Sequence, residues 1–371
     1  MFRTVLISVI TILQAYVFWR AQALATFADR RRKAALLGSG ALLWMMFVYA
    51  RAFQHYHSGK MAAFLELAGM DWMGIVFVCA ACLLFAEIAT GFGYLFPRTA
   101  YKVRAAALTS GILFSVIGIV QGLRQPAVSD YEVELRGLPP DRDGTVLAVM
   151  TDMHLGSLIG GKWLKARVEQ VNAMRPDLIA LVGDIYDGRS VSANEFISEF
   201  RELRAPLGVW VAMGNHESYR DTAKHLGSFS QAGFRVLLNE NASAAPGLTI
   251  AGVEDLTVKK RQGADRAALE KTMHGAGSGG LILLSHSPLL EHEAAAYGAG
   301  LMLSGHTHDG QLWPFNYLVK LRYPHIAGRY LIDGMTLLVC RGTGTWGPRM
   351  RLWRRGEILR VTLRAPHPKT N

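Results

Sequence analysis

Four apolar runs in the first third of the chain constrain its architecture more than any other feature. They occupy residues 4–19, 34–50, 72–96 and 105–123. A helix needs about 20 residues to cross the hydrocarbon core of a bilayer, so each run is long enough, or nearly so, to span one. The chain has 371 residues, of which 50% are hydrophobic. We therefore predict an α-helical transmembrane region of about four spans over residues 1–125.

The first apolar run permits a second interpretation. Arg3 precedes an apolar core, and residues 21–23 (Ala-Gln-Ala) resemble a signal-peptide cleavage site. Trp19 and Arg20 are unfavourable neighbours for cleavage, and three further apolar runs follow. A membrane span is therefore the preferred interpretation, with a cleaved leader as the alternative.

Aromatic and acidic residues within these runs refine the prediction. Trp19, Trp44, Trp72 and Tyr94 lie near the ends of the expected spans, where aromatic side chains favour the membrane interface. Glu87 is an acidic residue inside a span. Such a residue is either functional or paired within the helix bundle, and both interpretations stay open here.

Basic residues near the spans predict the orientation. The first and third interhelical loops carry eight of them, against four in the second loop and at the flanks. The eight are Arg20, Arg30, Arg31, Arg32, Lys33, Arg98, Lys102 and Arg104. Because basic loops stay on the cytoplasmic side, the first and third loops should be cytoplasmic. With four spans, we expect an integral protein of the cell (inner) membrane whose C-terminal part is extracytoplasmic.

The net charge of +11 does not indicate a nucleic-acid partner. Residues 1–125 hold 12 Lys and Arg against 4 Asp and Glu, a net charge of +8. The remainder therefore carries only +3, too little for a groove that follows a phosphate backbone. We expect the membrane, with its anionic headgroups, as a partner and no nucleic acid.

The rest of the chain predicts one α/β domain. Residues 126–144 form a connector, 145–365 the domain and 366–371 a tail. Expected strands cover 145–151, 178–183, 208–213, 235–238, 248–253, 280–285, 300–304, 336–341 and 357–363, and Tyr131–Leu135 forms one in the connector. Expected helices cover 161–174, 191–203, 221–232, 264–275 and 288–297. Nearly continuous apolar strands that alternate with helices indicate an α/β sandwich.

Five short polar motifs each lie at or just after the end of an apolar, strand-like run. They are Asp152-Met153-His154, Gly183-Asp184-Ile185-Tyr186-Asp187, Gly214-Asn215-His216-Glu217, Ser285-His286 and Gly305-His306-Thr307-His308. Open α/β folds place their functional sites at the carboxyl ends of strands. Alone, Asp152 or Asp184 would more often cap a helix or form a turn, Gly214-Asn215 would be a turn, and His286 a helix cap. Five such motifs in this order instead predict a site with two metal ions.

The residue types fit such a site. Two metals roughly 3.5–4 Å apart need a ligand that bridges them, and Asp184 is the candidate. Asp152 and His154 are two residues apart, so a regular strand would point both side chains to one face. His306 and His308 have the same spacing, and each could serve a different metal if the backbone turns at Gly305.

Ligand chemistry narrows the choice of metal. Asn215 offers a neutral amide oxygen, which leaves the metals more Lewis acidic. A mixed set of oxygen and imidazole donors suits two divalent ions of Mn, Fe or Zn better than Mg or Ca. Cys79, Cys82 and Cys340 form no plausible ligand set and are expected to pack as small hydrophobic residues.

The five motifs resemble those of the calcineurin-like metallophosphoesterase superfamily, which run D-x-H, G-D-x-x-D, G-N-H-[DE], H and G-H-x-H. The resemblance implies a two-sheet α/β sandwich. It also implies that Asp152, His154, Asp184 and His308 hold one metal. Asp184, Asn215, His286 and His306 would hold the second. By the same resemblance, His216 contacts the phosphate and assists the leaving group, while Asp187 and Glu217 orient the ligands or His216.

Two further stretches resemble one branch of that superfamily. These are residues 305–311 and 341–348, which read GHTHDGQ and RGTGTWGP. The branch is that of transmembrane proteins with a metallophosphoesterase domain.

The expected function follows from this resemblance. It is a membrane-anchored phosphoesterase, with phosphodiesterase activity favoured, in which a hydroxide that bridges the metals attacks a lipid-linked or envelope phosphate. One alternative is hydrolysis of the pyrophosphate of UDP-diacylglucosamine, which requires a cytoplasmic domain. The other is a non-catalytic role in binding a phospholipid or a partner.

Overall fold

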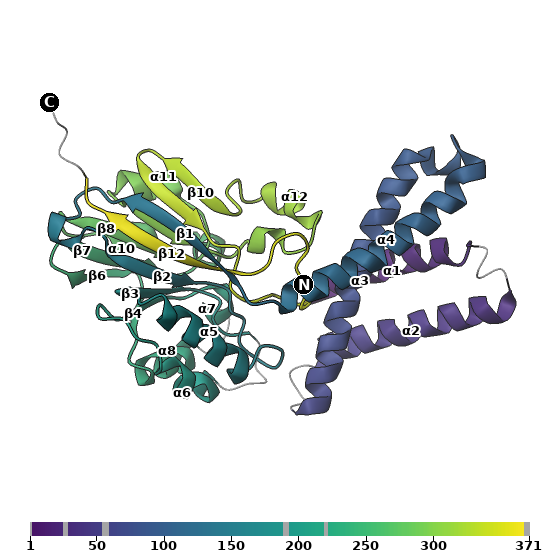
Figure 1. Ribbon diagram of the computed structural model, residues 1–371, viewed down its shortest axis with the longest axis horizontal. Helices are drawn as coiled ribbons and strands as arrows, with labels where there is room; N and C mark the ends of the chain where they lie inside the picture. The colour runs from purple at the N-terminus through teal and green to yellow at the C-terminus, as the bar shows by residue number, and fades with distance from the viewer. Residues whose placement is uncertain (1, 25–28, 54–58, 188–192, 219–221, 367–371) are drawn as a thin grey trace. The chain divides into compact units, whose positions relative to one another are not determined.

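The computed structural model describes residues 2–24, 29–53, 59–187, 193–218 and 222–366 (Figure 1). The chain divides into two compact units. The helical unit comprises residues 1–124, 311–315 and 347–355. The sandwich unit comprises residues 125–310, 316–346 and 356–371.

Four long helices form most of the helical unit. They are α1 (Phe2–Ala21), α2 (Arg30–Phe53), α3 (Lys60–Ala89) and α4 (Pro97–Leu123), and a short 3-10 turn, η2 (Gly91–Gly93), joins the last two. Each of the four contains a stretch long and apolar enough to cross a bilayer. The prediction of about four spans is therefore confirmed. Helix α3 is in contact with each of the other three.

Two of the aromatic residues expected at the membrane interface form hydrogen bonds between helices. Helix α3 begins at Lys60, well before the apolar run, so Trp72 lies inside the helix. The Trp72 indole N–H donates to Oε1 of Gln14 over 2.8 Å, and the Trp44 N–H donates to Oγ1 of Thr11 over 2.8 Å. These bonds satisfy the polar end of each indole within the bundle.

Glu87 is paired inside the helical unit. Its buried carboxylate accepts two hydrogen bonds from Arg104 of α4, from Nε at 2.7 Å and from Nη2 at 2.8 Å. Arg20 of α1 contributes a second ion pair, with Nε 2.9 Å from Oε1 of Glu87. Of the two interpretations of this glutamate, the structure shows the paired one. Helices α1, α3 and α4 are thus linked by a bidentate ion pair between Arg104 and Glu87 and by a second ion pair from Arg20.

One loop from far along the chain belongs to the helical unit. Met350 is fully buried beside two small residues: a Cβ added to Gly74 would lie 2.6 Å from its Sδ, and one added to Gly118 would lie 3.3 Å from its Cε. The backbone N–H of Arg349 donates to Oδ1 of Asp71 over 2.7 Å, and that of Arg351 donates to the carbonyl of Gly118 over 2.8 Å. Glycines on α3 and α4 thus leave the space that this loop fills.

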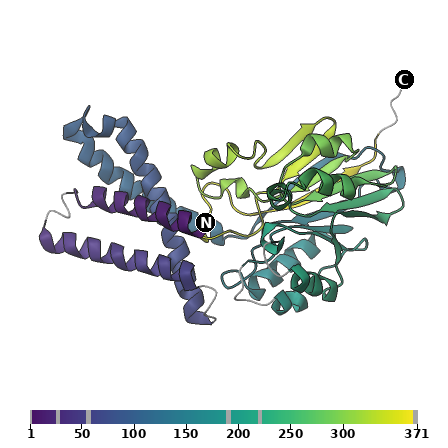
Figure 2. The ribbon, with the colours of Figure 1, turned by 180° about the vertical axis from the view of Figure 1, so that it is seen from behind.

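Two six-stranded sheets form the sandwich unit (Figures 1 and 2). The first has the order β1-β12-β2-β3-β4-β5 and the second β10-β11-β9-β8-β7-β6. The strands are β1 (Ala127–Glu134), β2 (Val146–Met150), β3 (Leu178–Val182), β4 (Val209–Ala212), β5 (Arg235–Leu237), β6 (Glu240–Ala245), β7 (Leu248–Val253), β8 (Gly280–Ser285), β9 (Leu301–Ser304), β10 (Gly328–Ile332), β11 (Met335–Val339) and β12 (Glu357–Arg364). Neighbours β2, β3, β4 and β5 run parallel, as do β7, β8, β9 and β11.

Helices and turns connect these strands. They are η3 (Pro140–Arg142), α5 (Gly161–Ala173), η4 (Ala193–Phe196), α6 (Ile197–Phe200), α7 (Asn215–Ser218), α8 (Thr222–Gln231), α9 (Leu256–Arg261), α10 (Asp265–Met273), α11 (Glu291–Ala296), η5 (His308–Gly310) and α12 (Phe315–Lys320). Helices α5, α6 and α8 pack on the first sheet, and α9, α10 and α11 on the second. A buried apolar core lies between the sheets, with Val149 and Ala180 from one and Leu284 and Leu303 from the other. The prediction of a two-sheet α/β sandwich is confirmed.

Several element boundaries differ from the prediction. The helix expected over 191–203 is only η4 and α6, with residues 191 and 192 outside the described part of the chain. The helix expected to start at residue 288 begins at Glu291, because Leu290 has a left-handed φ of 58°. Strands β6 and β10 were not expected, since they are partly exposed outer strands without a continuous apolar run.

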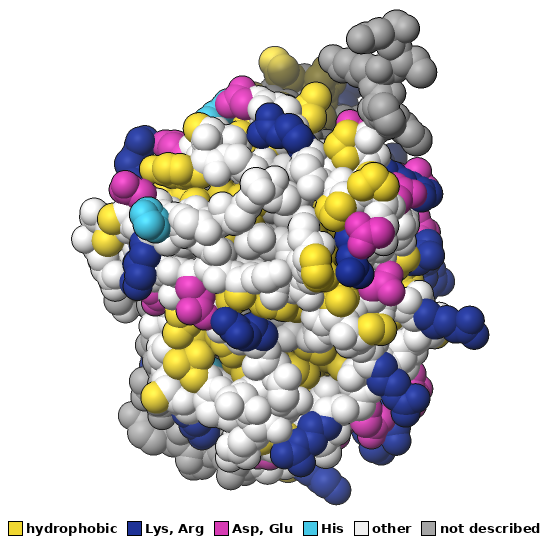
Figure 3. Space-filling view, turned by 90° about the vertical axis from the view of Figure 1, so that its left-hand side faces the viewer, with side chains coloured by type: hydrophobic (Ala, Val, Ile, Leu, Met, Phe, Trp, Pro, Cys, Tyr) yellow, Lys and Arg dark blue, Asp and Glu magenta, His cyan; other side chains and the backbone are white. Residues whose placement is uncertain are grey.

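The surface of the sandwich unit mixes charges of both signs. Arg364 pairs with Glu132 at 2.8 Å, and Arg360 pairs with Asp130 at 3.2 Å. On the face drawn in Figure 3, Lys and Arg side chains lie among acidic and hydrophobic ones, without a continuous basic tract on that face.

Candidate metal centre

The predicted ligands all follow the carboxyl ends of strands. Asp152, Asp184 and Asn215 come two or three residues after β2, β3 and β4, which are parallel neighbours in the first sheet. His286 directly follows β8, and His306 follows β9, its parallel neighbour in the second sheet. Because parallel neighbours end at the same edge of a sheet, the polar residues that follow them lie together at that edge.

The backbone at these positions has an unusual conformation. Asp152, His154, Asp184, His306 and His308 all have positive φ angles, between 49° and 69°. The expectation that strand alternation would bring Asp152 and His154 to one face is therefore wrong, because both lie in a left-handed loop after β2 ends. Such conformations cost about 1–3 kcal/mol each in a non-glycine residue, and they cluster at functional sites.

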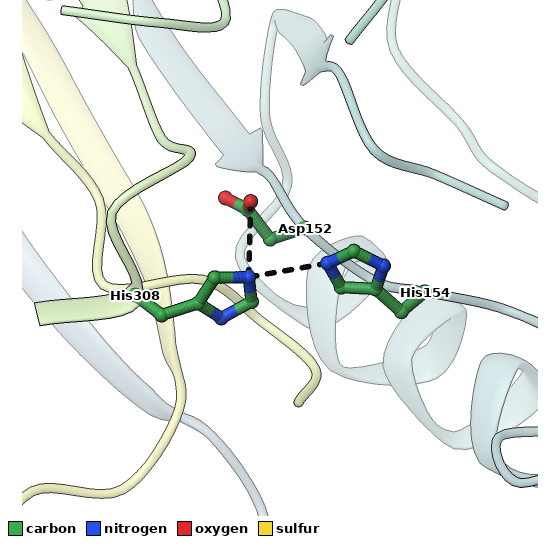
Figure 4. Close-up of side chains that lie close together, drawn as sticks. All are labelled: Asp152, His154 and His308. Atoms are coloured by element: carbon green, nitrogen blue, oxygen red, sulfur yellow. Dashed lines mark hydrogen bonds and ion pairs between the residues drawn. The ribbon is translucent and has the colours of Figure 1, made fainter. Parts of the chain in front are cut away.

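One group of donors comprises Asp152, His154 and His308 (Figure 4). Nε2 of His308 lies 3.3 Å from Oδ1 of Asp152 and 3.1 Å from Nε2 of His154. All three side chains are buried. Two imidazole nitrogens this close need either a shared proton or a cation between them, so the group fits a metal ion.

A second group comprises Asp184, His286 and His306. Nε2 of His286 lies 3.1 Å from Oδ2 of Asp184, and Nδ1 of His306 lies 3.3 Å from Nε2 of His286. The two histidines of the last motif thus enter different groups, as a backbone turn at Gly305 allows.

Asp184 belongs to the second group and also faces His154 of the first, and it forms a further candidate group with His154 and His216. Its Oδ2 is 3.1 Å from Nε2 of His286 and 4.0 Å from Nε2 of His154, which belongs to the first group. The same oxygen is 3.9 Å from Nε2 of His216. One carboxylate oxygen of Asp184 thus lies within 4.0 Å of ring nitrogens of three histidines.

Asn215 supplies an independent test of whether a cation fits. Its Oδ1 is buried and accepts no hydrogen bond from the part of the chain that the structure describes. A buried amide oxygen without a partner costs free energy unless something binds it. An oxygen acceptor beside carboxylates and imidazoles is a donor set suited to Mn, Fe or Zn, so the residues present fit divalent metal ions.

Glycines of the motifs allow these close approaches. A Cβ added to Gly214 would lie 2.2 Å from Oδ1 of Asp184, and one added to Gly305 would lie 2.3 Å from Oδ2 of Asp152. At Gly183, a Cβ would lie 2.5 Å from the ring of His286. Any side chain at these positions would therefore occupy the space that the ligands use.

His216 is held at the edge of the centre. Its backbone N–H donates to Oδ1 of Asp184 over 2.9 Å, and its Nδ1 lies 3.0 Å from Oδ1 of Asp187. Its side chain is 21% exposed, more than those of the surrounding histidines His154, His286 and His308. Burial alone would lower the pKa of His216, but Asp184 and Asp187 outweigh it and raise the pKa to about 9.

Glu217 organises the backbone under the centre. Its fully buried carboxylate accepts hydrogen bonds from the backbone N–H groups of Asp184 (3.0 Å), Tyr186 (2.9 Å) and Gly214 (2.9 Å). It therefore joins the loop after β3 to the loop after β4, and fixes the position from which the Asp184 side chain extends.

The other histidines of the centre have pKa values shifted in opposite directions. Burial would lower the pKa of His286, but Asp184 and Asp152 raise it well above its ordinary value. Burial and the neighbouring His216 lower the pKa of His154 to about 3, and burial and His286 lower that of His306 to about 4. The carboxylates thus favour protonation of His286 and His216, while His154 and His306 stay neutral.

The structure also reveals residues that the motifs did not indicate. The hydroxyl of Tyr323 lies 2.9 Å from Nε2 of His306. The buried carboxylate of Asp255 accepts hydrogen bonds from the hydroxyls of Thr257 and of Ser287, which follows His286 in the chain. Neither residue belongs to a motif: Tyr323 contacts the candidate ligand His306, and Asp255 contacts the residue that follows His286.

Comparison with known proteins agrees with this geometry. Residues 145–310 match the family model described as calcineurin-like phosphoesterase. A transmembrane protein with metallophosphoesterase domain from Bos taurus is 32% identical over 286 residues, which cover 72% of this chain and 64% of that protein. The chain thus spans a little under two thirds of that relative's length.

Two further matches differ in strength. An uncharacterized metallophosphoesterase from Aquifex aeolicus is 34% identical over 248 residues, which cover 64% of this chain and 91% of that protein. Among solved structures, a dimetal phosphatase from Danio rerio matches 59% of this chain and 99% of its own at 16% identity, with a TM-score of 0.36. The sequence matches carry the assignment: the chain belongs to the calcineurin-like metallophosphoesterases.

Proposed function

We propose that the protein is a membrane-anchored phosphodiesterase with a centre for two divalent metals. The observation that supports this most directly is the position of Asp184, whose Oδ2 faces histidines of both donor groups. Asp152, His154, Asp184 and His308 would hold one metal. Asp184, Asn215, His286 and His306 would hold the other. When bound, the two metals supply Lewis acidity and lower the pKa of a water molecule, which is the chemistry that phosphate-ester hydrolysis needs.

His216 would act on the leaving group. Asp187 engages its Nδ1 at 3.0 Å, which orients the ring and leaves Nε2 directed toward the centre, 3.9 Å from Oδ2 of Asp184. From there the imidazole donates a hydrogen bond or a proton to the departing oxygen of the ester. Asp187 is then a positioning residue, and Glu217 holds the Asp184 loop in place by its three backbone hydrogen bonds.

The substrate we propose is a lipid-linked or envelope phosphate ester. Four membrane-spanning helices in the same chain favour a substrate that resides at a membrane. The excess of basic residues in the first and third interhelical loops supports an inner-membrane protein whose sandwich unit is extracytoplasmic.

The test uses the full chain in nanodiscs, loaded with Mn²⁺ or Zn²⁺. Hydrolysis of bis(p-nitrophenyl) phosphate is compared with that of p-nitrophenyl phosphate for the unchanged chain, Asp184→Asn and the control Asp333→Asn. Asp333 is an exposed residue of a hairpin turn with a φ of 47°, which asparagine also adopts. Metal-dependent turnover with preference for the diester, lost only in Asp184→Asn, supports the proposal.

Two outcomes contradict it. Near-normal turnover of Asp184→Asn with a normal metal content would remove Asp184 from the bridging position. If the chain binds two metals but hydrolyses neither ester, and does not hydrolyse phospholipid either, the proposed catalysis is wrong and a role in binding is left. His216→Ala distinguishes a metal ligand from a residue that assists the leaving group. We expect this variant to keep both metals and to hydrolyse the ester more slowly.

A further inference from the structure

Helix α12 and the turn that follows it carry an exposed apolar face. Tyr317, Leu318 and Leu321 are all exposed, with Leu318 at 57% and Leu321 at 85%. The helical path continues past the end of α12, because the N–H of Leu321 donates to the carbonyl of Leu318 and that of Tyr323 to the carbonyl of Val319. A leucine this exposed loses the benefit of apolar burial unless something covers it.

The orientation of this face is fixed by the opposite side of the same segment. Tyr317, Leu318 and Leu321 are spaced by three and four residues, so they share one side of the helical turn. Val319 and Tyr323 share the other side, and there Tyr323 is buried with its hydroxyl on His306. The segment cannot rotate to hide its leucines without breaking that contact.

The start of the segment belongs to the helical unit. Phe315, the first residue of α12, packs edge to face on Phe77 of α3 with ring centroids 5.9 Å apart. Two residues earlier, Trp313 stacks on Phe85 of α3 with ring centroids 5.4 Å apart. Helix α3 is long and apolar enough to span a membrane, so the residues with which the segment begins pack on a candidate membrane span.

Two exposed cations lie among the apolar residues. Lys320 and Arg322 flank Leu321 in the sequence. The Arg322 guanidinium lies over the ring of Tyr323, 5.2 Å from the ring centroid. Aromatic and leucine side chains on one side with basic residues beside them are typical of helices that lie in a membrane interface. The cations would meet anionic headgroups while the leucines reach the acyl chains.

We propose that residues 315–322 form a membrane-contact segment, which lies in the headgroup region of the bilayer that the four helices span. Its occupant is lipid, because the residues that lead into the segment, Trp313 and Phe315, pack on a candidate membrane span. The proposal concerns a surface, so it holds or fails independently of the proposed hydrolysis.

Depth-dependent quenching tests it in the full chain. Leu321→Cys is labelled with an environment-sensitive fluorophore and reconstituted in nanodiscs of ordinary phospholipid or of phospholipid brominated high on the acyl chains. The control is Leu331→Cys, at a leucine on β10 that is 73% exposed. The unchanged chain, whose Cys79, Cys82 and Cys340 are buried, gives the background labelling.

We expect brominated lipid to reduce the emission at position 321 by about half or more, because an interfacial helix inserts its apolar face roughly 5–10 Å below the headgroups. Emission at position 331 should not change. Leu318→Cys is a second reporter on the same face and should behave as position 321 does. Equal emission in both lipids at positions 318 and 321 would overturn the proposal and indicate a protein partner, and so would equal quenching at position 331.

Discussion

The hydroxyl of Tyr323 lies 2.9 Å from Nε2 of His306, whose other ring nitrogen faces His286 at 3.3 Å. The two nitrogens of this imidazole thus have separate partners. When the Nε2–H of His306 donates to the Tyr323 hydroxyl, Nδ1 carries no proton and is free to act as a ligand, and the bond also sets the rotation of the ring.

Tyr323→Phe should weaken the binding of one metal. The substitution keeps the ring, which packs edge to face on His306 at 5.1 Å, and removes only the hydroxyl. Loss of such a partner typically costs about 10–100-fold in metal affinity. Metal titration followed by mass spectrometry of bound ions should show one weakened site and one unchanged site, while the melting temperature without metal stays similar.

Tyr330→Phe is the matched control, since its hydroxyl donates to the carbonyl of Ala327 over 2.9 Å, away from the candidate ligands. It should leave both metal affinities unchanged. If Tyr323→Phe binds both metals as tightly as Tyr330→Phe does, the hydroxyl has no role in positioning His306.

Gly214→Ala should displace Asp184. The added methyl would lie 2.4 Å from the backbone nitrogen of Asp184 and 2.2 Å from its carboxylate, and neither the backbone nor a ligand can move away without changing the centre. We expect loss of bound metal and a drop in activity of at least about 100-fold, as for ligands misplaced by about 1 Å. Elemental analysis of the purified chain, together with the diester assay, measures both effects.

Gly227→Ala, in helix α8, controls for the methyl group itself. A Cβ there has no neighbour within 4 Å, so the substitution should leave stability unchanged or stabilise the helix by about 1 kcal/mol. Full metal content in Gly214→Ala would show that the loop after β4 has more room than this structure gives it.

How far the sequence could predict this centre depends on what each residue does. The ligands follow apolar strands within fixed motifs, so the amino-acid pattern alone places Asp152, Asp184 and His286 at the ends of β2, β3 and β8. The left-handed conformation of Asp152 and His154 is not predictable in this way, because propensity assigns such angles to glycine or asparagine. The convergence of these two residues was expected, but for the wrong reason.

Contacts that depend on the whole fold were beyond the sequence. Tyr323 reaches His306 only because the chain after β9 turns back through α12. Likewise, Met350 enters the helical unit from the far end of the chain, and no periodicity links it to Gly74 or Gly118. Strands β6 and β10 escaped prediction because partly exposed edge strands carry a weak hydrophobic pattern.

Glu217→Gln should destabilise the sandwich unit. Three backbone N–H groups converge on this carboxylate, and a glutamine can offer only one acceptor oxygen in its place. At least one buried N–H then faces an NH₂ group, which costs about 1–3 kcal/mol. We expect a lower midpoint of urea denaturation together with reduced metal content.

Glu202→Gln is its control, because that side chain is exposed. It should change the midpoint only within error. A normal midpoint for Glu217→Gln would mean that its three backbone hydrogen bonds are dispensable for the loop that carries Asp184.

Gly122→Ala should release the loop that contains Met350 from the helical unit. A methyl on Gly122, near the end of α4, would lie 2.4 Å from the carbonyl oxygen of Arg349 and 2.9 Å from Cα of Met350. Both are backbone atoms, so the loop must shift. Overpacking of this kind costs about 1–3 kcal/mol, which corresponds to roughly 5- to 150-fold faster exchange of the amides that the seated loop protects.

Hydrogen exchange of the full chain in nanodiscs measures this effect. The N–H groups of Arg349 and Arg351 are bonded to Asp71 and to the carbonyl of Gly118, so they should exchange faster in Gly122→Ala. Gly38→Ala in α2, where a Cβ meets nothing within 4 Å, should leave them unchanged. Equal protection in both variants would mean that the loop keeps both hydrogen bonds to the helices when it is displaced. Gly122 would then not be needed to hold the loop against the helical unit.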